Sequence, residues 1–226
     1  MVEDENHVSS VGIKVRAESL SDLVFGLALS IGSLDFLSSP AKNAHELLLN
    51  VAFFGFSFII LVFVWLGYTR TMAVLPRESS TSLFLNIVLL FLVALEPYLF
   101  FVLLRAPSIP LAGIFSVFYA INIGLMFLVQ AGLARLVILE DRKSEVLHEK
   151  RLPAVIIARF RAVIISEILI GAAYLVSTLP FFWEVSTPVG QLRFVIWYSS
   201  FAIFFIRIRP KEIKNPKAEA REPSHN

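Results

Sequence analysis

The chain has 226 residues, of which 57% are hydrophobic and only 17% are charged, and its formal net charge is +2. Too few polar residues are present to cover a soluble domain of this size, so the composition predicts an integral membrane protein. Cysteine is absent, which excludes disulfides and cysteine metal sites.

The N-terminal segment, 1–18, is polar and acidic and lacks the basic start and short apolar core of a cleavable signal peptide. We expect this segment to stay in the cytoplasm. Six apolar segments follow, each about long enough to cross a bilayer at a rise of 1.5 Å per residue. The predicted fold class is therefore all-α, an integral membrane bundle over 19–206 with six transmembrane helices at 19–37, 47–69, 82–104, 110–134, 156–179 and 189–206.

The distribution of Lys and Arg predicts the orientation of these helices. Of the 20 basic residues, 17 lie in the N-terminal segment, between the second and third spans, from 135 to 161, and after 206. Six spans place these four segments on one side and leave Lys42, Arg105 and Arg193 on the other. The positive-inside rule then predicts that both termini are cytoplasmic. We also expect a charged cytoplasmic linker at about 135–155, a basic cytoplasmic tail at 207–226, and a multi-pass position in the cell (plasma) membrane.

The first span is the least hydrophobic of the six. It carries Asp22 and Asp35, and its small residues allow close helix approach. On a helix, two adjacent stripes form: Leu23, Leu27, Ser30 and Leu34 on one, and Asp22, Gly26, Leu29 and Ser33 on the other. Two different neighbours are therefore predicted. A helix packed inside the bundle, with Asp22 bonded to a neighbour, and a helix that lines a pore both fit this pattern.

Successive spans run in opposite directions, so the ends of spans one to three lie at similar cytoplasmic depth. The polar residues that this depth brings together are Arg16, Ser21, Asp22, Trp65, Tyr68 and Asn86. Asp22 accepts hydrogen bonds, whereas Trp65, Asn86 and Arg16 can donate them. We predict a network among these residues, with an interfacial position of Trp65 as the alternative.

Two acids, Glu96 and Glu167, fall inside the third and fifth spans. Counting from the span starts places both near mid-membrane at comparable depth. Pro97 removes a donor and frees the carbonyl of Val93, so a structural hinge is one interpretation and a proton relay is another. If these acids are the working residues, the chain would be a proton-coupled carrier or an accessory membrane protein.

Enzyme chemistry finds little support in the sequence. The four histidines lie in termini or loops, with no second ligand at metal spacing, and no phosphate-binding loop or nucleophile elbow is present. We expect no enzyme activity, no cofactor and no bound metal. Nucleic-acid binding is not expected either, because it needs a folded basic surface.

The motif Arg16, three residues, Leu20-Ser21-Asp22, followed by a small-residue helix, resembles the opening of the transmembrane protein 175 family. That family's pattern is Arg, three residues, then Phe-Ser-Asp. Trp65 near the end of the second span, together with Asn86 and Pro97 in the third, resembles the family's next helices.

The resemblance implies a potassium-permeable cation channel that assembles as a homotetramer in the lipid bilayer. Its pore would be lined by the first helix of each subunit and constricted by a ring of aliphatic side chains. Carried over residue by residue, the pore positions are Leu27 and Ser30, with Leu23 and Leu34 on the same stripe. Such a ring would gate monovalent cations by dewetting.

The chain departs from the family pattern at four places. Leu20 stands where Phe is usual, Leu23 where Gly is usual, Ser30 where Thr is usual, and Tyr68-Thr69 where paired His often follow the Trp. The resemblance therefore implies the fold, while ion selectivity does not transfer with it.

Overall fold

The computed structural model describes residues 19–33, 41–75, 79–146, 152–188 and 190–208. The first helix spans Ser19–Ser33. It is followed by α2 (Ala44–Val74), α3 (Ser80–Leu104), α4 (Ile109–Val146), α5 (Ala154–Val176), α6 (Phe181–Glu184), β1 (Ser186–Thr187), β2 (Gly190–Gln191) and α7 (Leu192–Ile208).

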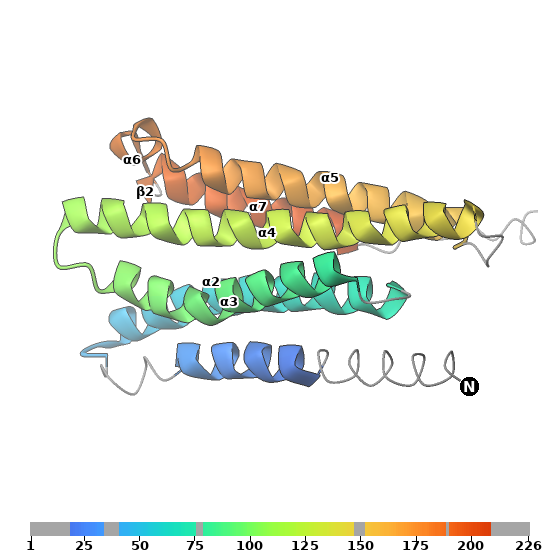
Figure 1. Cartoon of the computed structure of the whole chain (residues 1–226). Helices are drawn as coiled ribbons and strands as arrows, with labels where there is room; N and C mark the ends of the chain where they lie inside the picture. The colour runs from blue at the N-terminus through green and yellow to red at the C-terminus, as the bar shows by residue number, and fades with distance from the viewer. Residues whose placement is uncertain (1–18, 34–40, 76–78, 147–151, 189, 209–226) are drawn as a thin grey trace, which may run out of the picture.

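The long helices lie side by side, and successive ones run in opposite directions (Figure 1). α4 is the central element, because it packs against α2, α3 and α5, and α7 packs on α5. The first helix lies at one edge of the bundle, next to the α2–α3 pair (Figure 1). An all-α membrane bundle is therefore confirmed.

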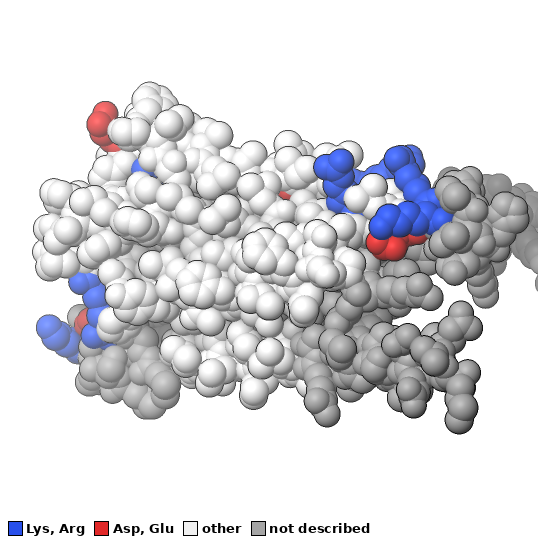
Figure 2. Space-filling model, in the orientation of Figure 1, with Lys and Arg blue, Asp and Glu red and all other residues white. Residues whose placement is uncertain are grey.

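Three helices, α2, α3 and α4, are long and apolar enough to cross a membrane. Among the described residues the remaining long helices are shorter or more charged: the first helix has 15 described residues, α7 has 17, and α5 carries Arg159, Arg161 and Glu167. Six crossings thus stay a prediction. Figure 2 shows charged side chains gathered mainly at the two ends of the visible face, with a wide band between them in which only a small acidic spot is visible, as expected of a bilayer-spanning protein.

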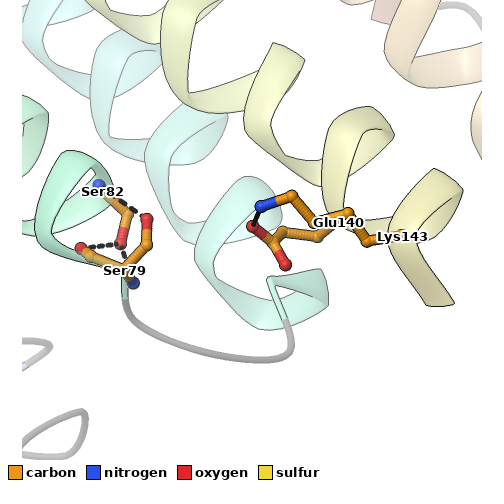
Figure 3. Close-up of polar contacts among 4 residues, drawn as sticks. All are labelled: Ser79, Ser82, Glu140 and Lys143. Atoms are coloured by element: carbon orange, nitrogen blue, oxygen red, sulfur yellow. Dashed lines mark hydrogen bonds and ion pairs between the residues drawn. The ribbon is translucent and has the colours of Figure 1, made fainter. Parts of the chain in front are cut away.

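Helix starts in the α2–α3 pair are fixed by side-chain caps. The Asn43 side chain accepts a hydrogen bond from the Glu46 backbone N–H at 2.8 Å. At the start of α3, Ser79 and Ser82 form a reciprocal capping box, each side chain accepting from the other's backbone N–H (Figure 3). These caps satisfy N–H groups that a helix cannot bond internally.

The charged C-terminal part of α4 continues the apolar helix without a break as far as Val146. Glu140 and Lys143 form an ion pair at 3.0 Å on its surface (Figure 3). Asp141 is buried and accepts a hydrogen bond from the Leu152 backbone N–H at 2.7 Å, which ties the start of the α5 segment to the end of α4.

A two-stranded hairpin, β1–β2, is the one departure from all-α structure among the described residues. Its turn includes Gly190 at φ 114°, a backbone conformation that residues with a Cβ rarely adopt. The strands occupy Ser186–Thr187 and Gly190–Gln191, and α7 consequently begins at Leu192 rather than at the predicted 189.

The backbones of α4 and α5 touch where Gly124 faces Gly171. A Cβ built on Gly171 would lie 2.9 Å from the Gly124 carbonyl oxygen, and one built on Gly124 would lie 3.1 Å from the Gly171 carbonyl oxygen. Only residues without a Cβ allow so close an approach. The contact also fixes the antiparallel register of the two helices, with 124 level with 171.

Candidate functional site: the first helix and its contacts

The first helix turns one face into the bundle, formed by Ser21, Phe25 and Ala28, all buried. Gly32 continues this face, since a Cβ there would lie 3.5 Å from the Phe54 ring. Of the predicted stripe Asp22, Gly26, Leu29 and Ser33, Asp22 and Leu29 do contact the bundle, but the centre of the packed face lies one position earlier. Gly26 and Ser33 are exposed, and the helix instead packs through the residues that precede them.

The opposite face of the first helix is uncovered. Leu23 and Leu27 are 67% and 56% exposed, and Leu20 and Ile31 are exposed beside them. Ser30 is exposed as well, and its hydroxyl donates to the Gly26 carbonyl at 2.8 Å. The three predicted pore residues 23, 27 and 30 thus share one uncovered face, while Leu34 lies outside the described residues.

Polar contacts join the start of the first helix to α2 and α3. The Trp65 indole N–H donates to Asp22 Oδ1 at 3.1 Å. The Ser21 hydroxyl lies 2.7 Å from the Tyr68 hydroxyl and donates to Asn86 Oδ1 at 3.5 Å. Five of the six residues expected in the network therefore lie together at this end of the first helix, and Arg16 lies outside the described residues.

Tyr68→Phe should weaken the attachment of the first helix to α2. The substitution keeps the ring, which lies 5.9 Å from the Phe25 ring, and removes the hydroxyl that contacts Ser21. We expect a loss of about 1 kcal/mol of stability, the usual net contribution of a buried hydrogen bond. A double-mutant cycle with Ser21→Ala, read by thermal unfolding in detergent, measures the coupling. Additive losses would show that the two hydroxyls do not interact.

Glu96 is fully buried, with hydrogen bonds from two neighbouring helices. Its Oε1 accepts from the Ser57 hydroxyl at 2.8 Å and from the Tyr119 hydroxyl at 3.0 Å, so the carboxyl group links α2, α3 and α4. Sequence reasoning singled out Glu96 but neither partner. The only sequence feature that could have indicated Ser57 and Tyr119 is that each is a hydroxyl residue within an apolar segment. This feature does not show which helix the hydroxyl group faces.

The two intramembrane acids do not lie at comparable depth. Glu96 bonds to Tyr119 of α4, whereas the Gly124–Gly171 register places Glu167 level with position 128. Nine residues of α4 separate these levels, which is about 13 Å along the helix. The expectation of equal depth is therefore wrong, because the helices start at different heights.

Pro97 lies within a continuous α3. Near it the Asn122 amide of α4 donates to the carbonyl of Leu92 at 3.1 Å, one residue before the Val93 carbonyl that the proline frees. A hydrogen bond between α3 and α4 thus lies close to the predicted hinge.

Arg193 is a candidate that the sequence did not reveal, since it was only counted among the three basic residues on the side opposite the termini. It is 1% exposed. Its guanidinium donates to the carbonyls of Ser177, Thr178, Leu179 and Gly113 and to the Ser116 hydroxyl. The last carbonyls of a helix have no N–H partner within the helix, and the planar guanidinium group of Arg193 donates several hydrogen bonds to such carbonyls at the end of α5.

The apolar helices, the broad apolar surface between the two charged ends and the alternating helix directions define a multi-pass α-helical membrane protein. Residues 16–97 match the family model described as the endosomal/lysosomal potassium channel TMEM175. Residues 16–97 are therefore similar to the TMEM175 family of potassium channels, which confirms the predicted resemblance over this part of the chain.

The fold is also similar to a solved structure. A crystal structure of a variant of the potassium channel MtTMEM175, in complex with a nanobody–MBP fusion protein, superposes with a TM-score of 0.54 at 17% sequence identity. The match covers 85% of this chain and 88% of that chain. At this identity the likeness establishes the fold. No curated protein matches the sequence.

Proposed function

We propose that this protein is a potassium-permeable cation channel in which the first helices of four subunits surround one pore. The constriction is formed by Leu27 together with Leu23 and Leu34, and Ser30 lies on the same stripe. All six long helices cross the plasma membrane, and both termini are cytoplasmic.

The observation that carries this proposal is the composition of the uncovered face of the first helix. Besides Leu23 and Leu27, this side of the helix exposes Asp22, Gly26 and Ser30. Ionisable and small polar residues are costly against lipid and are typical of subunit contacts and water-filled paths. The helix also lies at the edge of the bundle (Figure 1), where a second copy can reach it.

Closed rotational symmetry brings this helix to a shared axis. One bundle cannot enclose a pore with a single helix, whereas four copies place four leucines at each level. A ring of leucine side chains excludes water when narrow, and this gates ion flow by dewetting. Flux through such a ring depends steeply on side-chain volume.

Leu27→Ala should increase potassium flux into proteoliposomes severalfold, or admit sodium, because the constriction widens by the volume lost from every subunit. The matched control is Leu169→Ala on α5, where the leucine is 57% exposed against 56% for Leu27. This control should leave flux unchanged.

Equal flux in the two alanine variants would contradict the pore assignment, and no potassium flux above empty liposomes would contradict the channel itself. A carrier based on the intramembrane acids predicts the opposite pattern. Transport would then collapse in Glu96→Gln or Glu167→Gln and tolerate Leu27→Ala.

Subunit arrangement can be tested separately because the chain contains no cysteine. Leu27→Cys should cross-link with a short bis-maleimide into dimers, the largest species that one cysteine per subunit allows, whereas Leu169→Cys should remain monomeric on a denaturing gel. Cross-linking that is equally efficient at both positions would contradict a shared axis at the first helix.

A further inference from the structure

Exposed basic side chains gather where the ends of α4 and α5 meet, on the face shown in Figure 2. The Lys and Arg residues of the described parts of these two helices are Arg135, Arg142, Lys143, Arg159 and Arg161, and all five are exposed. We call them the α4–α5 basic patch.

The helix register places three of these arginines at one level. Arg135 lies eleven residues after Gly124, and position 160 lies eleven residues before Gly171. Because α4 and α5 run antiparallel from that contact, Arg135 is level with Arg159 and Arg161, about 16 Å from the crossing point. The hydrogen bond between Asp141 and the Leu152 backbone confirms that the register persists to the helix ends.

The positive charge of this patch is not neutralised by nearby acids within the described residues. Glu140 pairs with Lys143, Asp141 is buried against Leu152, and no acid pairs with Arg135, Arg142, Arg159 or Arg161. Three guanidinium groups at one level therefore present unpaired donors.

From the arginines towards the middle of α5, the exposed surface becomes apolar. Ile165 and Ile168 follow Arg161 at one and two helical turns, and both are exposed. A cationic rim above an exposed aliphatic surface matches the two parts of a phospholipid, since guanidinium groups hydrogen-bond phosphate oxygens and aliphatic side chains contact acyl chains.

We propose that the α4–α5 basic patch binds an anionic phospholipid. The headgroup phosphate is held by Arg161, whose side of α5 also carries Ile165 and Ile168 for an acyl chain, and Arg135 and Arg159 add positive charge at the same level. The apolar surface beside the arginines favours a lipid over a soluble phosphate. This binding does not depend on ion conduction.

The test measures lipid retention on the purified full-length protein by native mass spectrometry. Phosphatidylglycerol is titrated against phosphatidylcholine, for wild type and for the variant with Arg135→Gln, Arg159→Gln and Arg161→Gln combined. Wild type should retain phosphatidylglycerol preferentially. Each substitution should weaken the preference about fivefold, and the three together about a hundredfold.

Arg70→Gln is the matched control, because Arg70 is an exposed arginine of α2 outside the patch. It should bind as wild type does. The three arginines are exposed, so the combined variant should fold, and its unfolding temperature without added lipid verifies this. Combined Arg→Lys substitutions at the same positions should restore most of the preference, since the charge is kept.

Equal retention of the two lipids by wild type would overturn the proposal, as would an equal loss in Arg70→Gln. Glycerophosphoglycerol, the water-soluble headgroup, separates the lipid from a free phosphate. If it displaces phosphatidylglycerol at comparable concentration, the acyl-chain contact is absent and the lipid proposal is wrong.

Discussion

Arg193→Ala should be the most damaging single substitution in the half of the bundle that carries the β1–β2 hairpin. It removes every donor that the guanidinium gives to the end of α5 and the first turns of α4. The buried carbonyl of Ser177 loses this partner, whereas the carbonyl of Gly113 keeps the hydrogen bond from the Ser116 hydroxyl. Each orphaned buried polar group costs about 1–3 kcal/mol. We expect a total loss of about 3–5 kcal/mol, measured as the free energy of unfolding in detergent.

Arg193→Lys and Arg105→Ala provide the comparison for this prediction. Lysine keeps the charge but has no planar fork to reach several carbonyls at once, so its loss should be intermediate. Arg105 is an exposed arginine of the α3–α4 connection, and its guanidinium lies 4.6 Å from the Phe101 ring. Its removal should cost about 1 kcal/mol or less. If Arg193→Ala lowers the free energy of unfolding no more than Arg105→Ala does, the hydrogen bonds of Arg193 are not an important source of stability.

Gly171→Ala should destabilise the protein by about 2 kcal/mol, although alanine favours a helix over glycine by about 1 kcal/mol. The added methyl would lie 2.9 Å from the Gly124 carbonyl oxygen and 3.0 Å from Leu128 Cγ. A backbone atom cannot move aside as the end of a side chain can, so α4 and α5 must separate. Thermal and denaturant unfolding in detergent measure the change.

Gly55→Ala is the control with the opposite expected sign. A Cβ at Gly55 meets nothing within 4 Å, so helix propensity alone should act and stabilise the protein by up to about 1 kcal/mol. Two glycine-to-alanine changes in helices of one protein then differ only in their surroundings. Equal effects would show that the α4–α5 contact is looser than the structure has it.

Several features of the candidate site could be predicted because they depend on local sequence and depth. The positions of Ser21, Asp22, Trp65 and Asn86 follow from antiparallel neighbours with known starting points, and the structure brings them together. The predicted packed face of the first helix is displaced by one residue from the observed one. Which side of a helix is packed depends on the neighbouring helices, and the sequence of one helix does not show where they lie. Residues 23, 27 and 30 share an uncovered face, and their role in a pore stays a prediction.

The partners of Glu96 and the burial of Arg193 could not be found from the sequence. Ser57 and Tyr119 lie 39 and 23 residues away from Glu96, and the carbonyls bound by Arg193 belong to segments up to 80 residues away. Periodicity describes one helix at a time and contains no information on how far one helix slides along another.

The sequence by itself determined that this is an all-α membrane protein, where its long apolar segments lie and which family its first part resembles, because apolar length, charge placement and a short motif are local properties. Only the tertiary structure decided that Glu96 and Glu167 lie at different depths, that Arg193 closes the end of α5, and that Arg135 lies level with Arg159 and Arg161. The physical reason is the glycine contact at 124 and 171, which sets one register between two helices that the sequence leaves free to slide.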